Sequence, residues 1–196
     1  MYRSLFVVIA ITGASCAYPR PAVRLLGDYS SITSQAMNLN DDTALADYDT
    51  RDTSIEVVVQ TMAARPQLEN RILALVNRKR AGAGVKPLSF SPELAKAAHE
   101  HSAAMAREGF FEHRGDGEPA LFDRVTASGM DTDHVGENIF ETNDGVSGAV
   151  ADECVEMWMQ SDGHRLNMLS PEFGKTGIAV GVSNNGENYI TEDFAH

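Results

Sequence analysis

The sequence is poor in cysteine and in positive charge. Only two cysteines occur among 196 residues, which excludes the disulfide framework typical of small secreted scaffolds. The 16 lysines and arginines are outnumbered by 28 acidic residues, and the resulting net charge of -12 repels nucleic acid and anionic membrane surfaces. We therefore expect no nucleic-acid partner. With 43% hydrophobic residues the chain can still fill a core, so packing must stabilise the fold.

A short apolar run near the N-terminus predicts a secretory signal peptide in residues 1–17. Arg3 precedes the hydrophobic residues 5–11, and small residues follow them. This run is far shorter than the roughly 20 residues that span a bilayer. Two processing routes remain open: signal peptidase cleavage after Ala17, or a lipoprotein signal in which Cys16 carries a lipid anchor. We expect the protein to be secreted, periplasmic or held at the cell surface, with this anchor as its only link to a membrane.

Residues 18–65 differ in composition from the rest of the chain. They carry seven acidic and four basic side chains and are rich in Ser, Thr, Asn and Asp. Such a composition buries too little apolar surface to fold alone. We interpret this stretch as a largely disordered, acidic tether or pro-segment, and residues 66–196 as the folded domain.

Hydrophobic spacing in the domain predicts several helices followed by a hairpin. Helices are expected from Pro66 to a break at residues 81–84, from Pro92 to Gly109, from Pro119 to Ser128 and from Ser147 to Asp162, with a short helical turn at Arg165–Leu169. Two strands, Thr176–Val182 and Asn188–Phe194, flank a turn that contains Asn185-Gly186. Because helices precede strands rather than alternating with them, an α+β layered domain is favoured over a parallel doubly wound one.

Two histidines and a glutamate are the candidate site residues. His113 and His164 each follow a predicted helix end, and Glu137 lies between them on a predicted connection. If the fold brings them together, two imidazoles and a carboxylate can hold a divalent metal such as zinc. The same groups can also form an acid/base cluster in which the carboxylate orients one ring. Sequence spacing alone does not show convergence.

Seven short motifs follow one another in a specific order within the stretch from Leu68 to Phe194. They are Leu75-Val76-Asn77-Arg78, Leu88-Ser89-Phe90-Ser91-Pro92-Glu93-Leu94, Gly109-Phe110-Phe111-Glu112-His113, Asp123-Arg124, Gly136-Glu137-Asn138-Ile139, the run from Trp158 to Leu169, and Gly177-Ile178-Ala179-Val180-Gly181. In this order they resemble a bacterial member of the CAP superfamily of SCP-like extracellular domains. That superfamily includes cysteine-rich secretory proteins, insect venom antigens and plant pathogenesis-related proteins.

The resemblance implies a three-layer α-β-α sandwich with a surface cleft that holds two histidines and two glutamates. His113, His164 and Glu137 match three of these positions. The second glutamate of the family lies three residues after the helix tryptophan, where this chain has Ser161, so the cleft is one carboxylate short.

The last strand also departs from the family pattern. The usual Tyr-Trp-Thr-Gln is replaced by residues 189–192, Tyr-Ile-Thr-Glu. By the resemblance, this change is expected to remove an aromatic residue from the rim and to add a carboxylate at Glu192.

From these features we expect a non-catalytic extracellular binding module. His113 and His164 are the expected metal ligands, and Glu137 and Ser161 line the cleft for an unknown ligand such as a lipid or a cell-wall component. The alternative is a metal-assisted hydrolase, acting on peptides or cell-wall material, in which Glu137 is the base and the two histidines hold the metal. A lipid or sterol carrier is a third, weaker alternative.

Several other residues are expected to be structural. Arg124 is predicted to bind loop carbonyls or a carboxylate near the cleft, and Asn138 to tie down the segment that presents Glu137. Trp158 and Cys154 lie on one helical stripe and are predicted to be buried. His101 is predicted to be packed in the core.

Overall fold

The computed structural model describes the backbone of residues 53–196 and the side chains of residues 63–196. The predicted signal peptide at residues 1–17, with Cys16 and Ala17, and the predicted tether up to residue 52 lie outside the described residues. Among the helices that are described, none combines the length and the apolar character needed to cross a membrane.

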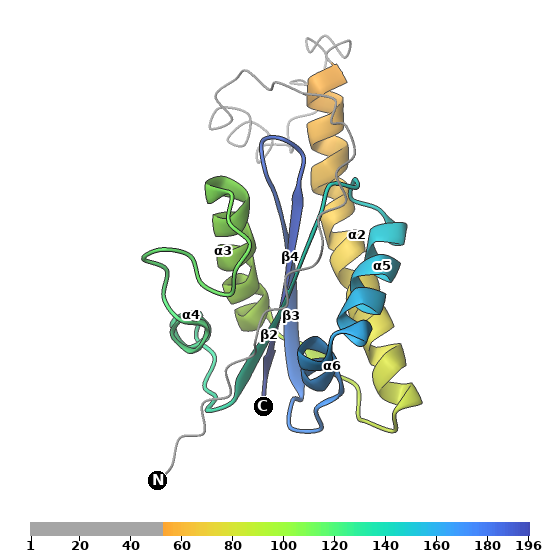
Figure 1. Ribbon diagram of the computed structural model, residues 1–196, viewed down its shortest axis with the longest axis vertical. Helices are drawn as coiled ribbons and strands as arrows, with labels where there is room; N and C mark the ends of the chain where they lie inside the picture. The colour runs from red at the N-terminus through yellow and green to blue at the C-terminus, as the bar shows by residue number, and fades with distance from the viewer. Residues whose placement is uncertain (1–52) are drawn as a thin grey trace, which may run out of the picture.

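The described chain forms three layers with a mixed sheet in the middle. The strands are β1 (Ser89–Phe90), β2 (Val135–Thr142), β3 (Lys175–Val182) and β4 (Asn188–Ala195), in the spatial order β1-β3-β4-β2. One face of the sheet is covered by α2 (Thr53–Gly82), α5 (Gly148–Gln160) and α6 (Asp162–Leu169), and the other by α3 (Pro92–Glu108) and α4 (Leu121–Ala127), as Figure 1 shows. The predicted α+β three-layer sandwich is therefore confirmed.

Strand pairing places β2 at one edge of the sheet. The predicted hairpin is present, with β3 antiparallel to β4 and Gly186 in the turn at a φ of 88°, a conformation that favours glycine. β4 pairs on its other side with β2, again antiparallel, whereas β1 pairs with β3 in parallel. The prediction of a connection at residues 136–138 was wrong, because they belong to β2. Residues 136–139 are buried, but Glu137 and Asn138 are polar, so the sequence does not show the hydrophobic pattern of a strand.

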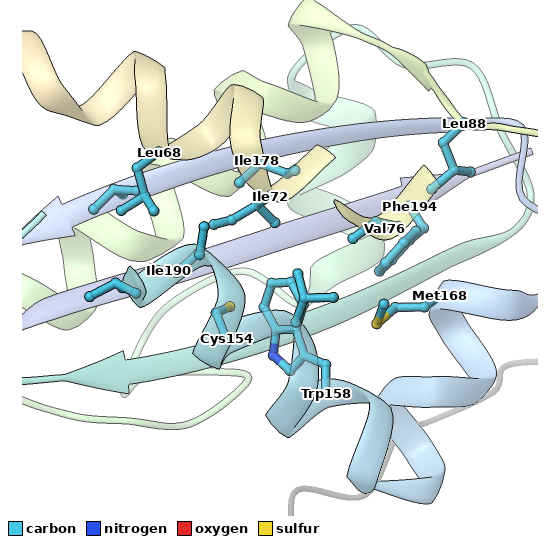
Figure 2. Close-up of a cluster of buried hydrophobic side chains, with 14 of the residues drawn as sticks. Leu68, Ile72, Val76, Leu88, Cys154, Trp158, Met168, Ile178, Ile190 and Phe194 are labelled. Atoms are coloured by element: carbon cyan, nitrogen blue, oxygen red, sulfur yellow. The ribbon is translucent and has the colours of Figure 1, made fainter. Parts of the chain in front are cut away.

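The main core fills the space between the sheet and the layer of α2, α5 and α6 (Figure 2). Its largest member is Trp158, which is 1% exposed and donates its indole N–H to the carbonyl of Ile139 at 3.0 Å. Cys154 is also fully buried, and burial raises the pKa of its thiol. Both predicted core positions are confirmed. The indole hydrogen bond ties α5 to β2, the strand that carries Glu137.

On the other face, α3 lies directly on β3 because two glycines leave room for it. A Cβ atom at Gly177 would lie 1.9 Å from the backbone nitrogen of Ala95, and one at Gly181 would lie 2.2 Å from the carbonyl oxygen of Ser102. Real side chains never approach backbone atoms so closely. The contact between helix and strand is therefore made by backbone, and it fixes the position of α3.

The helix ends follow local sequence signals, with one exception. α3 begins after Ser91, whose side chain accepts a hydrogen bond from the backbone N–H of Leu94, and ends at Gly109 in the left-handed conformation, as predicted. α2 includes residues 53–65, whose composition had indicated part of the tether. Pro66 removes one backbone donor but does not end the helix.

Candidate functional site

The candidate site lies across the outer edge of β2, where the two helical layers meet. His113 comes from the connection between α3 and α4 on one face, and His164 from the first turn of α6 on the other. Their ring centroids are 6.5 Å apart. Glu137 points from β2 toward His113, with its Oε1 2.7 Å from the ring Nδ1. The structure thus brings together the three residues that the sequence predicts.

The local setting of His164 differs from the prediction. The break between the two helices falls at Ser161, whose backbone is extended with a φ of -88° and a ψ of 124°, and Gly163 lies inside α6. His164 is therefore part of a helix rather than of the segment after one. Asn138 donates a side-chain hydrogen bond to the backbone carbonyl of His164 at 3.2 Å, which ties this helix to β2 and confirms the predicted role of Asn138.

The carboxyl group of Glu137 is ionised and accepts hydrogen bonds, although the residue is only 1% exposed. Its Oε1 accepts from His113 and its Oε2 from the guanidinium Nη2 of Arg124. Burial alone would raise the pKa of Glu137, but the hydrogen bond from His113 and the positive charge of Arg124 outweigh it and lower the pKa. An ionised carboxylate can only accept, so Nδ1 of His113 carries the proton. In the neutral form of this ring, Nε2 then has a free lone pair.

Arg124 connects this carboxylate to the loop that carries His113. Its side chain is buried, and its Nη1 donates to the backbone carbonyls of His113 and Pro119, each at 3.3 Å. The prediction that Arg124 binds loop carbonyls and a carboxylate near the cleft is confirmed.

A second histidine and glutamate extend the network into the interior. His101 of α3 is fully buried, and its Nδ1 lies 2.7 Å from Oε1 of Glu118. Its Nε2 lies 3.8 Å from Oε1 of Glu137. The sequence predicts only that His101 is packed and does not reveal this link. A histidine on the buried stripe of a helix needs a polar partner, so the position of His101 in the sequence could have indicated that such a partner exists.

The two site histidines have one property in common. Nε2 of His113 and Nε2 of His164 are both buried and have no hydrogen-bond partner within the described chain. Burial, with a smaller contribution from the nearby His113, lowers the pKa of His164 to about 4. His164 is therefore neutral at neutral pH, so an imidazole lone pair is available on this ring also.

Ser161, the remaining predicted cleft residue, lies at the junction of α5 and α6. Its backbone N–H donates to the carbonyl of Met157 at 3.2 Å. No hydrogen bond within the described chain joins its hydroxyl to His113 or His164. The geometry therefore provides no Ser-His pair at this junction.

The side chains of the site could hold a metal ion weakly, but they do not supply the full set of protein ligands that a structural metal site has. In the described part of the chain, no group of three or more His, Cys, Asp or Glu side chains is arranged to hold a metal ion. His113 and His164 supply two imidazole nitrogens, while each oxygen of Glu137 accepts a hydrogen bond from a neighbouring side chain. Structural zinc sites use four protein ligands and catalytic ones usually three. Water or a bound ligand would have to complete the coordination of any metal held by two histidines.

The last strand does not contribute to the rim, contrary to the expectation from the family pattern. Ile190 and Glu192 are both fully buried on the face covered by α2, where Ile190 joins the core. Thr176 donates its hydroxyl hydrogen to Oε1 of Glu192 at 3.2 Å. Burial raises the pKa of Glu192 to about 8, although the hydrogen bond from Thr176 and the charge of Arg80 act in the opposite direction. The carboxyl group therefore belongs to the interior and not to the cleft.

Comparison with known sequences gives one family. A model of the cysteine-rich secretory protein family, abbreviated CAP, matches residues 73–194. YkwD of Bacillus subtilis is 33% identical over 126 residues, which cover 64% of this chain and 46% of that protein. The membrane protein YlbC of the same organism is 32% identical over 126 residues, which cover 64% of this chain and 34% of YlbC. This chain therefore spans less than half the length of either relative.

Solved structures share the fold. An extracellular protein with an SCP domain from Bacillus anthracis superposes with a TM-score of 0.57 at 26% identity, covering 67% of this chain and 41% of that one. An outer surface protein from Borrelia burgdorferi gives a TM-score of 0.59 at 12% identity, covering 66% of this chain and 92% of that one.

Proposed function

Because this chain belongs to the cysteine-rich secretory protein (CAP) family, we propose that it is an extracellular, non-catalytic binding module whose His113 and His164 bind a divalent metal ion. An extracellular place is supported by the predicted signal at residues 1–17 and by the similar Bacillus anthracis protein, which is described as extracellular. Intact mass of the mature protein tests secretion and distinguishes cleavage after Ala17 from lipidation of Cys16.

The observation that carries the metal proposal is the pair of unpartnered, buried Nε2 atoms. Buried polar atoms in folded proteins nearly always have a partner, and one metal ion bound by both rings would give each of these two atoms a partner. Glu137 and Arg124 orient the His113 ring so that its neutral form has the lone pair on Nε2, and the low pKa of His164 keeps the second ring neutral. A bound divalent ion would supply a Lewis-acidic position for an oxygen of the extracellular ligand.

A metal-assisted hydrolase is less well supported by the same geometry. A general base must reach the water or substrate proton that it removes, but Glu137 is only 1% exposed and its carboxylate is held by hydrogen bonds from His113 and Arg124. The structure also gives no specific support to a lipid or sterol carrier. A surface pocket of about 320 Å³ beside β1 is lined by Glu93, Asp131 and Lys175 as well as apolar residues, and this charged lining does not suit a lipid tail.

Zinc titration of the chelator-treated full chain tests the metal proposal. We expect one zinc ion per chain by calorimetry, with shifts of the His113 and His164 ring signals in NMR spectra. His113→Ala and His164→Ala should each weaken binding at least about tenfold, because each removes one of two protein ligands. His99→Ala, on the exposed face of α3, is the matched control and should bind as wild type does. Ring signals that stay unchanged at millimolar zinc would end the metal proposal.

The non-catalytic assignment has its own test. Peptide, ester and peptidoglycan substrates are incubated with zinc-loaded wild type and with His164→Ala, and we expect no turnover by either. Turnover by the wild type that is lost in His164→Ala would contradict the assignment and support the hydrolase. Turnover that survives the substitution would come from a contaminant or another site.

A further inference from the structure

Asp193 is a buried residue of β4 next to the site, and it has no role in the function proposed above. β4 places it directly opposite Glu137 of β2 in the antiparallel register. It is fully buried, and neither of its carboxyl oxygens accepts a hydrogen bond from a donor in the described chain. Side chains alternate along a strand, so Asp193 points to the face covered by α3, whereas Phe194 points into the core on the opposite face. A buried carboxyl group thus adjoins the carboxylate that holds His113.

If Asp193 were ionised, it would be an unsolvated charge next to another of the same sign. A buried carboxylate without a donor is so unfavourable that such groups normally take up a proton. Two carboxyl groups in contact do not both ionise either. The charged and titratable groups around Asp193 are Glu137 of β2, Arg124 of α4 and His101 of α3. Glu192, its neighbour in β4, acts on it from the opposite face of the sheet.

The donors around the two carboxyl groups decide which one holds the proton. Glu137 receives hydrogen bonds from His113 and Arg124, so its ionised form is stabilised. Asp193 receives none. Burial first, and then the charge of Glu137, raise the pKa of Asp193, and Arg124 offsets only part of this effect. The proton therefore belongs on Asp193, from which it can be donated to Glu137.

We propose that Asp193 is a positioning residue of the site, protonated in the folded protein and hydrogen-bonded as a donor to Glu137. This donor, together with Arg124, fixes the Glu137 carboxylate so that it accepts from Nδ1 of His113 and leaves Nε2 free. The consequence for metal affinity rests on the proposed function, whereas the protonation of Asp193 does not.

The first test observes the proton itself. The full chain is labelled with ¹³C at the side-chain carboxyl carbon of aspartate, which leaves Glu192 and all other glutamates silent. We expect one aspartate resonance to remain at the position of a protonated acid from about pH 5 to about pH 7, where ordinary aspartates are ionised. It should be absent from Asp193→Asn and present in Asp131→Asn, an exposed control. If every aspartate resonance titrates below about pH 5, the proposal is overturned.

The second test asks whether the donor positions His113. Asp193→Asn keeps a donor in a neutral side chain of the same shape, so the ¹⁵N signals of the His113 ring should still show Nδ1 protonated. Asp193→Leu removes the donor, and we expect a mixture of the two ring tautomers. Where the wild type binds zinc, the leucine variant should also bind about tenfold more weakly. Ring signals of the leucine variant identical to wild type would overturn the positioning role.

If that variant does not fold, loss of the Nδ1-protonated tautomer in Asp193→Asn would overturn it instead. A wild type that binds no zinc removes the proposed function but leaves both NMR tests valid.

Discussion

Glu192→Gln should make the protein lose less stability than the wild type as the pH rises from about 5 to about 8. The folded-state pKa of Glu192 is about 8, against an ordinary value of 4.5. Between these values the native state keeps a proton that the unfolded chain has lost, so the free energy of unfolding falls as pH rises. The slope is about 1.4 kcal/mol per pH unit, and the loss between about pH 5 and about pH 8 is of the order of 3 kcal/mol. Glutamine carries no proton to lose and should remove this dependence.

The substitution preserves the contacts that the structure shows. The amide oxygen of glutamine can still accept from the Thr176 hydroxyl, and its NH₂ group can donate where Glu192 Oε2 has no partner in the described chain. Glutamine is also the usual family residue at this position, as the resemblance implies. A destabilising change of shape is therefore not expected.

Urea unfolding from about pH 5 to about pH 8, followed by the fluorescence of the single tryptophan, Trp158, measures the effect. The difference in free energy of unfolding between variant and wild type should shift in favour of the variant by about 3 kcal/mol over this range. Asp193 titrates in both proteins, so its contribution largely cancels in the difference. Glu100→Gln on the exposed face of α3 is the control and should give a difference that hardly changes with pH. Parallel curves for wild type and Glu192→Gln would refute the reasoning.

Two further predictions concern the α3 contact and the site. Gly177→Ala should destabilise the fold by about 3 kcal/mol or more, since its Cβ would lie 1.9 Å from the backbone nitrogen of Ala95. Gly174→Ala, with open space around it, should cost far less by the same urea measurement. The ring of His164 should titrate in metal-free protein with a midpoint of about 4 by NMR, because burial disfavours its charged form. A midpoint near 6.5 would show that this ring is open to water.

The sequence predicted those parts of the fold that depend on local signals. Ser91 and Gly109 define α3 because a cap and a left-handed glycine act within a few residues. The hairpin of β3 and β4 depends on a turn that glycine allows. β2 was missed because its polar residues are buried by packing from distant segments, and periodicity does not report such burial.

The candidate site could be predicted only in part. Residue type and position singled out His113, Glu137 and His164, but their spacing did not show that they converge, and the resemblance to a family supplied that expectation. The pairing of His101 with Glu118 depends on how α3 lies against the loop before α4, which no local pattern contains.

The two helical layers are attached to the sheet in different ways, and this difference governs how each can evolve. α2 and α5 meet the sheet through many interlocking side chains, so a change at one position can be compensated at a neighbour. α3 meets β3 through bare backbone at Gly177 and Gly181, where no neighbouring substitution can create space. β3 is therefore confined to glycine where it contacts the layer that carries His101 and leads into His113. Sequence drift should accumulate in the opposite layer and leave the geometry of the site unchanged.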